Sequence, residues 1–343
     1  MRDRPHKPTS ADIARLAGVS RSTVSRVING YLNVPEATRR RVQEVIAQHG
    51  YFPSTTGQVL RGKRSRCVGL FVHDTGFDAD LQASFIYAFT ERAHALGYMT
   101  LLGCVNQIAT PAGEHAVRTL LSSGRVDAGV FINAWGAGEL IRDLLDEGQV
   151  IGAVGMQSAD AEERLFTVAL DEAITHDLVA HASGMGHRTL AFICDANSHI
   201  DCLGWHRRMM QAAEGRGMQL LCPGCAGKAC VPVAAQVEAA LAQDAHHLLL
   251  VCADQAAVFA AYHAVHARGL TIGTDVSILG MGVIQDTLPL WPPLSGYRYD
   301  GREMAHTLAN QLIGGLEGAL DAQRHSRITY RWMQGASCAA SPI

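Results

Sequence analysis

Apolar residues recur at three- and four-residue intervals between residues 12 and 30, and this period predicts two short helices with a turn between them. Gly18 lies where the chain must turn, and a residue without Cβ is least strained there. Ser20 suits the N-cap of the second helix, and Thr9 with Asp12 forms a capping-box pattern for the first. Such a pair is typical of a helix-turn-helix, which places its second helix in the DNA major groove. The predicted core positions are Ile13, Ala14, Leu16, Ala17, Val19, Val24, Val27 and Ile28.

A third helix is predicted to begin near Pro35 and to end at Gly50, with its buried face formed by apolar residues between 42 and 46. Arginines 39–41 are placed to meet phosphate or solvent. The segment 54–61 is poor in helix formers, because it holds two Thr, a Gly and a Val. A basic linker follows at residues 62–66.

From residue 67 onward, short apolar runs of strand length alternate with segments of helical period. This alternation predicts βαβ units, parallel sheets and two doubly wound α/β lobes. The expected strands are 67–72, 99–102, 129–132, 150–154, 190–193, 248–251 and 276–279, and the expected helices are 83–96, 115–122, 138–147, 172–185, 203–217, 233–243 and 255–268.

Charge is distributed unevenly along the 343 residues. Residues 1–66 hold 13 Lys or Arg and 4 Asp or Glu, whereas the rest of the chain holds 16 and 28, so a basic head precedes an acidic body. This asymmetry indicates that only the head meets a polyanion, the alternative being a solvated, disordered tail. The sequence shows neither a long apolar run nor an apolar leader, so we expect a cytoplasmic protein without a membrane span, its nine cysteines reduced.

Several motifs along the whole chain resemble the lac repressor family of transcription regulators. In the head they are Asp12-Ile-Ala, Ala17-Gly-Val-Ser, Thr23-Val-Ser-Arg-Val, Asn29-Gly, Thr38-Arg, Gly50-Tyr-Phe-Pro and Leu60-Arg. In the body they include Gly97-Tyr98, Arg125-Val-Asp127, Gly186-His-Arg188, Gly204-Trp205, Asp254, Asp275-Val-Ser-Ile-Leu-Gly280 and Pro292-Pro-Leu294.

This resemblance implies an all-α helix-turn-helix head on a two-lobed, doubly wound α/β body similar to periplasmic sugar-binding proteins. The expected domains are a head at 1–53, a hinge helix and linker at 54–66, a first lobe at 67–165 that regains about 294–325, and a second lobe at 166–293 that regains about 326–338. Three crossovers would link the two lobes.

For DNA, the resemblance places Arg21 and Ser22 at the family's principal base-reading positions. Arg26 is a further base or phosphate contact, and the alternative for both arginines is nonspecific phosphate contact. The segment 54–61 matches the family's hinge helix, which is ordered on DNA and inserts a Leu into the minor groove; its alternative is an inert linker. The remaining expected DNA contacts and caps are Thr9, Ser20, Thr23, Ser25, Asn29, Ser54, Gly57 and Leu60, of which Leu60 is the minor-groove wedge and Gly57 weakens the helix.

Ligands in such folds bind between the lobes, at the carboxyl ends of strands. Three positions where sugar-binding members carry Arg, Asn and Asp hold Asp201, Ala253 and Gly282 here, so we do not expect a neutral hexose held in the usual way. Asp201 would instead pair with a cationic group or accept hydroxyl hydrogens; the alternative is that it faces solvent in a degenerate pocket. The expected effector residues are Asp74, Phe77, Trp135, Asp201, Trp205, Asp254 and Gly282, although the three aromatic residues suit the core equally well.

Cys222, Cys225 and Cys230 are closely spaced in one loop. They would bind zinc or form a redox pair, or remain free thiols, since the sequence supplies no matched fourth ligand. No cofactor is expected, and no phosphate loop, nucleophile elbow or metal-hydrolase motif points to an enzyme. The missing apolar leader and the basic head argue against a transported-solute binder.

These observations together predict a homodimeric repressor that binds a pseudo-palindromic double-stranded operator and responds to a small-molecule effector. The alternative is a DNA-binding regulator with a degenerate pocket that responds to a protein partner, a metal or a redox signal.

Overall fold

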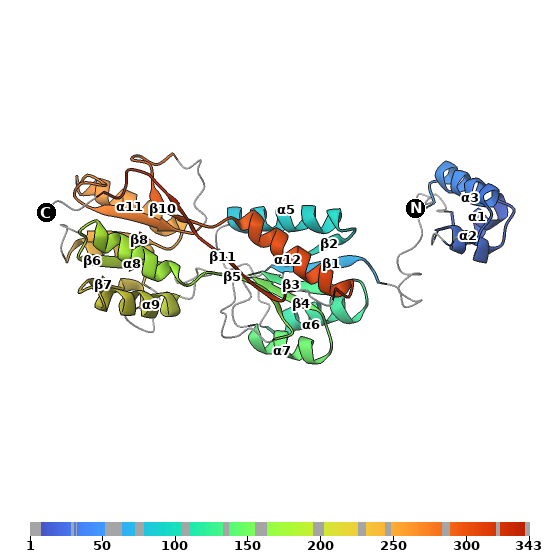
Figure 1. Ribbon diagram of the computed structural model, residues 1–343, viewed down its shortest axis with the longest axis horizontal. Helices are drawn as coiled ribbons and strands as arrows, with labels where there is room; N and C mark the ends of the chain where they lie inside the picture. Colours follow the sequence, from blue (N-terminus) through green and yellow to red (C-terminus); the bar gives the residue numbers. More distant parts are fainter. Residues whose placement is uncertain are drawn as a thin grey trace, which may run out of the picture. The chain divides into compact units, whose positions relative to one another are not determined.

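The computed structural model describes residues 8–28, 31, 33–51, 64–72, 79–104, 110–132, 137–154, 163–194, 202–225, 231–243, 248–282, 289–319 and 323–339 (Figure 1). The chain divides into two compact units, Met1–Ser65 and Arg66–Ile343. Within the described residues, no helix has the length and apolarity needed to cross a membrane.

The first unit is a small helical head. It contains α1 (Ser10–Leu16), α2 (Arg21–Ile28) and α3 (Glu36–His49), as the hydrophobic period predicts. Gly18 and Gly50 adopt positive φ angles of 64° and 57°, which end α1 and α3 in the left-handed region that glycine tolerates best. One apolar cluster joins the three helices, and its buried members are Ile13, Ala14, Ala17, Val24, Val27, Val34 and Val42.

The second unit contains two parallel sheets, each covered by helices on both faces. Among the described residues, the first sheet has the order β11-β5-β4-β3-β1-β2 and the second has the order β12-β10-β9-β8-β6-β7. The strands of the first sheet are β1 (Cys67–Val72), β2 (Met99–Cys104), β3 (Ala128–Ile132), β4 (Ile151–Val154), β5 (Phe166–Leu170) and β11 (His325–Ile328). Those of the second are β6 (Thr189–Ile193), β7 (Gln219–Leu221), β8 (Leu248–Cys252), β9 (Ser277–Met281), β10 (Ser295–Arg298) and β12 (Arg331–Met333), and β12 pairs antiparallel to β10.

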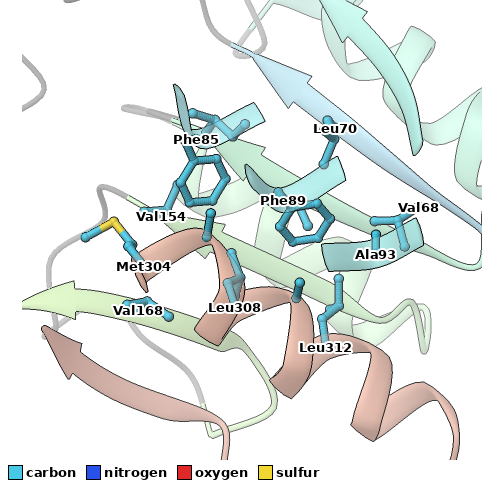
Figure 2. Packing of buried hydrophobic residues seen from close by; sticks show 14 of the residues in the cluster. Val68, Leu70, Phe85, Phe89, Ala93, Val154, Val168, Met304, Leu308 and Leu312 are labelled. Atoms are coloured by element: carbon cyan, nitrogen blue, oxygen red, sulfur yellow. The ribbon is translucent and has the colours of Figure 1, made fainter. Parts of the chain in front are cut away.

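The helices of the first lobe pack on opposite faces of its sheet. On one face α5 (Ala79–Ala95) and α12 (Gly301–Leu316) lie side by side, and Figure 2 shows Phe85, Phe89, Leu308 and Leu312 meeting the strands there. On the other face α6 (Pro111–Ser122) and α7 (Gly138–Asp146) bury an apolar stripe against Phe71 and Phe131.

The second lobe repeats this three-layer plan. One core contains α8 (Ile174–Gly184) and α9 (Cys202–Glu214), and the other contains α10 (Val233–Leu241) and α11 (Gln255–Ala267). A sheet buried on both faces explains why its central strands are continuous apolar runs. The expected two-lobed α/β body is therefore confirmed.

Sheet pairing moves the lobe boundaries a few residues later than expected. The expected second lobe begins at residue 166, yet β5 pairs with β4 of the first sheet. The expected first lobe regains residues 294–325, yet β10 pairs with β9 of the second sheet. The expected second lobe regains about 326–338, yet β11 (His325–Ile328), where that range begins, pairs with β5 of the first sheet. The chain therefore crosses between lobes after β5, after β10 and after β11, because partners far apart in sequence decide which sheet a strand joins.

Candidate DNA interface and effector site

The first turn of α1 is held by the capping box that the sequence predicts. Asp12 Oδ2 accepts from the Thr9 amide at 2.9 Å and from Thr9 Oγ1 at 2.7 Å, and the Asp12 amide donates to Thr9 Oγ1 at 3.3 Å. Two otherwise unpaired amides at the helix start are thereby satisfied. The Thr9 hydroxyl is engaged in its own helix, so its expected role as a DNA contact stays a prediction.

Helix α2 has one buried face and one exposed face. Val24 and Val27 are buried in the head core, whereas Arg21, Ser22 and Arg26 are exposed. Because 3.6 residues make a turn, Ser22 and Arg26 lie one turn apart on the face opposite the two valines. The exposed surface of α2 therefore presents the Ser22 hydroxyl and the Arg26 guanidinium on one face and the Arg21 guanidinium at the start of the helix, where the sequence predicts a base-reading helix.

Ser20 caps α2, as predicted: its hydroxyl accepts from the Thr23 amide at 3.1 Å. Ser20 Oγ also lies 2.7 Å from Ser22 Oγ and 2.9 Å from Thr23 Oγ1. Thr23 and Ser25 are half-buried. Four of the expected DNA contacts fall outside the described residues, namely Asn29, Ser54, Gly57 and Leu60, and their roles stay predictions.

The three arginines of α3 do not share one environment, although the sequence analysis treats them alike. Arg40 and Arg41 are exposed. Arg39 is half-buried and donates from Nη2 to the Tyr31 carbonyl at 3.1 Å, while its Nε lies 3.4 Å from Glu36. Arg39 therefore ties the chain after α2 to α3, which the spacing of charges along the sequence could not reveal.

In the body, two expected effector residues lie directly after adjacent strands of the second sheet. Asp254 follows β8 and is buried, and its Oδ1 accepts from the Ala257 amide at 2.8 Å as the N-cap of α11. Gly282 follows β9 with a φ of 103°, and its amide donates to the Tyr297 carbonyl at 2.9 Å. A Cβ at Gly282 would lie 3.8 Å from the ring of Tyr299, which begins the second crossover.

A third expected effector residue, Trp205 of α9, lies at the crossovers. The centre of its ring is 6.3 Å from the centre of the Tyr330 ring, on the third crossover. The Tyr330 ring is in turn 5.6 Å, centre to centre, from the ring of Tyr299 on the second crossover. Tyr330 packs against the apolar cores of both lobes. Burial raises the pKa of Tyr330 well above its usual value, and Tyr299 and Asp171 add to the effect, so the phenol stays neutral.

The first crossover also reaches α9. Arg208 lies over the Trp205 ring at 5.9 Å from its centre and 3.4 Å from a carboxylate oxygen of Glu172, which directly follows the end of β5 at Asp171. The described contacts therefore join α9 to the first and third crossovers, and Tyr330 in turn contacts the second. Sequence reasoning missed Glu172, Arg208 and Tyr330, because nothing local indicates that residues so far apart in the chain meet.

The remaining expected effector residues, Asp74, Phe77, Trp135 and Asp201, fall outside the described residues and stay predictions. The same holds for Cys230 of the cysteine loop, whereas Cys222 is half-buried and Cys225 ends a short 3-10 turn at Pro223–Cys225. Within the residues that can be described, no three His, Cys, Asp or Glu side chains form a group suited to a metal ion.

Comparison with known proteins identifies both units. Residues 9–54 match the model for bacterial regulatory proteins of the lacI family, and residues 179–338 match the periplasmic binding protein-like domain. The lactose operon repressor of Escherichia coli is 27% identical over 335 residues, covering 89% of this chain and 84% of its own. The chain is similar to lacI-family regulators over most of its length.

Other curated relatives and solved structures agree with this similarity. The regulator AscG of Escherichia coli is 26% identical, covering 90% of this chain and 92% of its own. The lac repressor dimer bound to operator and the anti-inducer ONPF superposes with a TM-score of 0.80 at 20% identity, covering 98% of this chain and 100% of that one. The predicted helix-turn-helix head, the two-lobed body and the lac repressor type of regulator are confirmed.

The curated relatives are named as transcription regulators and repressors rather than as enzymes.

A residue that the sequence analysis did not single out holds the carboxyl end of β6 to α10. The buried Gln236 of α10 bonds through its amide to both the N–H and the carbonyl of Cys194, which follows β6. A buried Gln on an otherwise apolar helix face was the available signal, since buried polar groups need partners.

Proposed function

We propose that this protein is a repressor that binds a pseudo-palindromic operator as a homodimer. A small molecule would lower or raise its affinity for that operator. One observation carries the proposal: α2 of a head that matches the lacI-family model exposes the side chains of Arg21, Ser22 and Arg26. An arginine fork suits guanine O6 and N7, and serine hydroxyls suit bases or phosphates.

The charge distribution supports DNA as the partner of the head alone. Residues 1–66 carry a large excess of Lys and Arg, and the body carries an excess of Asp and Glu. Affinity should therefore fall steeply with salt, because each neutralised phosphate releases counterions. The acidic body should contribute nothing favourable to this electrostatic part of the DNA affinity.

For the homodimer, an exposed apolar face on the first lobe supplies a surface that a second copy would cover. Leu102 of the edge strand β2 is 52% exposed on the face that α5 covers, and Tyr87 of α5 is 67% exposed. Large apolar side chains gathered at a sheet edge mark interaction surfaces. The lac repressor, whose solved structure is similar to this chain, forms a dimer on its operator, which is in keeping with this assignment.

The dimer face has a direct test. Leu102→Glu together with Tyr87→Glu should turn the dimer into monomers at micromolar concentration in analytical ultracentrifugation. Met210→Glu, at another exposed apolar residue on α9, is the matched control and should leave the dimer intact. An unchanged sedimentation coefficient in the double variant would remove this face from the proposal.

For the effector, we place the site beside Trp205, Asp254 and Gly282. Solved relatives are described with cellobiose and with ribose bound, which favours a small-molecule signal over a protein, metal or redox signal. In this chain Asp254 is engaged as a helix cap, and Gly282 offers no side chain. Charged side chains hold vicinal hydroxyls firmly. This chain lacks the Arg, Asn and Asp with which sugar-binding members hold their ligand, and their absence argues against a neutral hexose bound in the usual way.

The contacts of α9 connect this site to the crossovers between the two lobes of the body. Trp205 joins α9 to the third crossover and Arg208 joins it to the first, so a ligand that displaces α9 should shift the lobes relative to each other. Ligands change DNA binding only when they bind two lobe arrangements with different affinity. That difference in affinity would couple ligand binding at the effector site to operator binding by the head.

The DNA-binding proposal is tested with the full chain and a randomised DNA pool at low and physiological salt. Selection should enrich a two-fold symmetric sequence. Arg21→Ala with Arg26→Ala should abolish the preference over random competitor, while Arg142→Ala, an exposed arginine of the body, should not. If the wild-type dimer enriches no sequence, with or without a metabolite mixture, the proposal is refuted.

A further inference from the structure

Arg66, which the sequence analysis counts in the basic linker, is the first residue of the second unit and is held there by both its backbone and its side chain. Its amide donates to Asp127 Oδ2 at 2.7 Å, and its carbonyl accepts from the Met99 amide at 2.8 Å. Its guanidinium carbon lies 5.7 Å from the centre of the Tyr98 ring, and its Nη2 lies 3.8 Å from Glu317 Oε1. The point where the chain enters the first lobe is therefore fixed from several sides.

The groups that hold Arg66 are themselves anchored in the first lobe. Tyr98 is 1% exposed, and its hydroxyl donates to Glu317 Oε1 at 2.7 Å. Glu317 is the C-cap residue of α12, which packs beside α5 on the sheet. The Asp127 amide donates to the Cys67 carbonyl at 2.7 Å, at the start of β1. Arg66 is thus joined to the sheet and to α12.

The backbone of Arg66 is strained. Its φ is 53°, and among the described residues it is the one non-glycine residue with a positive φ. An L side chain in this region costs free energy, and such a residue persists only where its surroundings over-determine it. Gly97 leaves room for the side chain, since a Cβ there would lie 3.2 Å from Arg66 Nη1. The contacts therefore impose a turn that the residue itself disfavours.

These contacts give the basic charge of Arg66 a partner within the body. Its guanidinium faces an aromatic ring and a carboxylate of the first lobe, so binding a phosphate would require it to leave both. What the contacts do is set the direction in which the chain enters β1. A joint that bends would let each head take up many positions. A joint held by backbone and side chain restricts those positions.

We propose that Arg66 is a positioning residue for operator binding, a rigid joint that limits the spacing at which the two heads of a dimer can bind their half-sites. The inference rests on the proposed function, and it assigns Arg66 no contact with DNA. Two heads on stiff joints should accept one spacing of half-sites. Two heads on loose joints should accept several spacings with similar affinity.

The experiment measures binding of the full-length chain to duplexes that carry two copies of the half-site obtained by selection from the randomised pool. The central spacer is shortened or lengthened by one or two base pairs, and each base pair moves a half-site by about 3.4 Å and turns it by about 35°. Wild type should bind the best spacing at least about tenfold more tightly than its neighbours, which is about 1.4 kcal/mol. Arg66→Gly removes the guanidinium and the backbone restriction, and should reduce this preference to about threefold, half of that free energy.

A second variant and two controls separate the joint from a general defect. Glu317→Ala removes the carboxylate that Arg66 and Tyr98 share, and should relax the spacing preference in the same direction. It decides the question if Arg66→Gly does not fold. Arg142→Ala and Glu139→Ala change exposed residues of α7 in the same lobe and should leave the preference unchanged. Calorimetry of each variant checks that the body is folded.

The dependence of affinity on salt separates positioning from contact with DNA. Each phosphate contact that is lost lowers the slope of log affinity against log salt by about 0.9. Arg66→Gly should keep the wild-type slope on the best spacing, because its guanidinium is engaged within the body. A lower slope would make Arg66 a phosphate contact and overturn the inference.

The results also distinguish this inference from the proposed function. If wild type prefers one spacing and folded Arg66→Gly prefers it equally, the inference is overturned while the proposed function stands. The same conclusion follows if wild type accepts every spacing alike. If wild type enriches no symmetric site, the proposed function fails and the inference falls with it. A relaxed spacing in Arg66→Gly and Glu317→Ala, at an unchanged salt slope, supports the inference.

Discussion

Gln236 provides the most quantitative prediction, because its buried amide satisfies three backbone groups at once. Oε1 accepts from the Cys194 amide at 3.3 Å, and Nε2 donates at 2.8 Å to the carbonyls of both Cys194 and Val231. The side chain is 1% exposed. Gly224 lies against it, since a Cβ there would be 2.6 Å from Gln236 Oε1. The amide thus holds the end of β6 to α10 and to the cysteine loop.

Gln236→Leu removes these bonds with little change in volume. Each buried backbone group left without a partner costs about 1–3 kcal/mol. The two groups of Cys194 are buried, whereas Val231 is half-buried and can be hydrated, so we expect a loss of about 2–6 kcal/mol of unfolding free energy. At roughly 2 °C per kcal/mol for a unit of this size, Tm should fall by about 4–12 °C.

The measurement is thermal unfolding of the full chain by calorimetry, supported by urea titration. Gln243→Leu is the matched control, because Gln243 is exposed at the end of the same helix, and it should stay within about 0.5 kcal/mol of wild type. If Gln236→Leu loses no more than this control, the three hydrogen bonds do not stabilise the body as argued.

Three further predictions concern the head, the crossovers and the effect of pH. Thr9→Ala should cost the head about 1 kcal/mol and Thr9→Ser almost nothing, since Ser preserves the capping box; equal losses in urea titration would contradict this. A double-mutant cycle of Glu172→Gln and Arg208→Gln should give a coupling of at most about 1 kcal/mol, because the two side chains are 35% and 29% exposed; a larger value would mean that the pair is held more tightly than its exposure implies. Burial raises the pKa of Cys338 to about 11 from an ordinary 9.0, so its neutral thiol contributes stability below pH 9 that is lost as the pH rises toward 11. Cys338→Ala should flatten the fall in Tm over that interval, and an unchanged slope would refute the assignment.

The sequence alone determined the head and the central strands. The helices α1, α2 and α3 follow from hydrophobic period, caps and positive-φ glycines, because their contacts join residues close together in the chain. Central strands such as β8 are buried on both faces of the sheet, so each is a continuous apolar run. The hydropathy of the sequence alone therefore predicts them. The exposure of Arg21, Ser22 and Arg26 likewise follows from the phase of one short helix.

Tertiary structure decided the edges, the lobe boundaries and the connections between distant residues. Strands β7, β11 and β12 are partly exposed and carry no continuous apolar run, so only pairing with a neighbour makes them strands. Likewise Gln236 meets Cys194 across 42 residues, and Trp205 meets Tyr330 across both lobes. Hydropathy along the chain reports how deeply each residue is buried, but it does not report which partner buries it. That choice depends on long-range packing, where the energy of a contact is shared between residues that the sequence keeps apart.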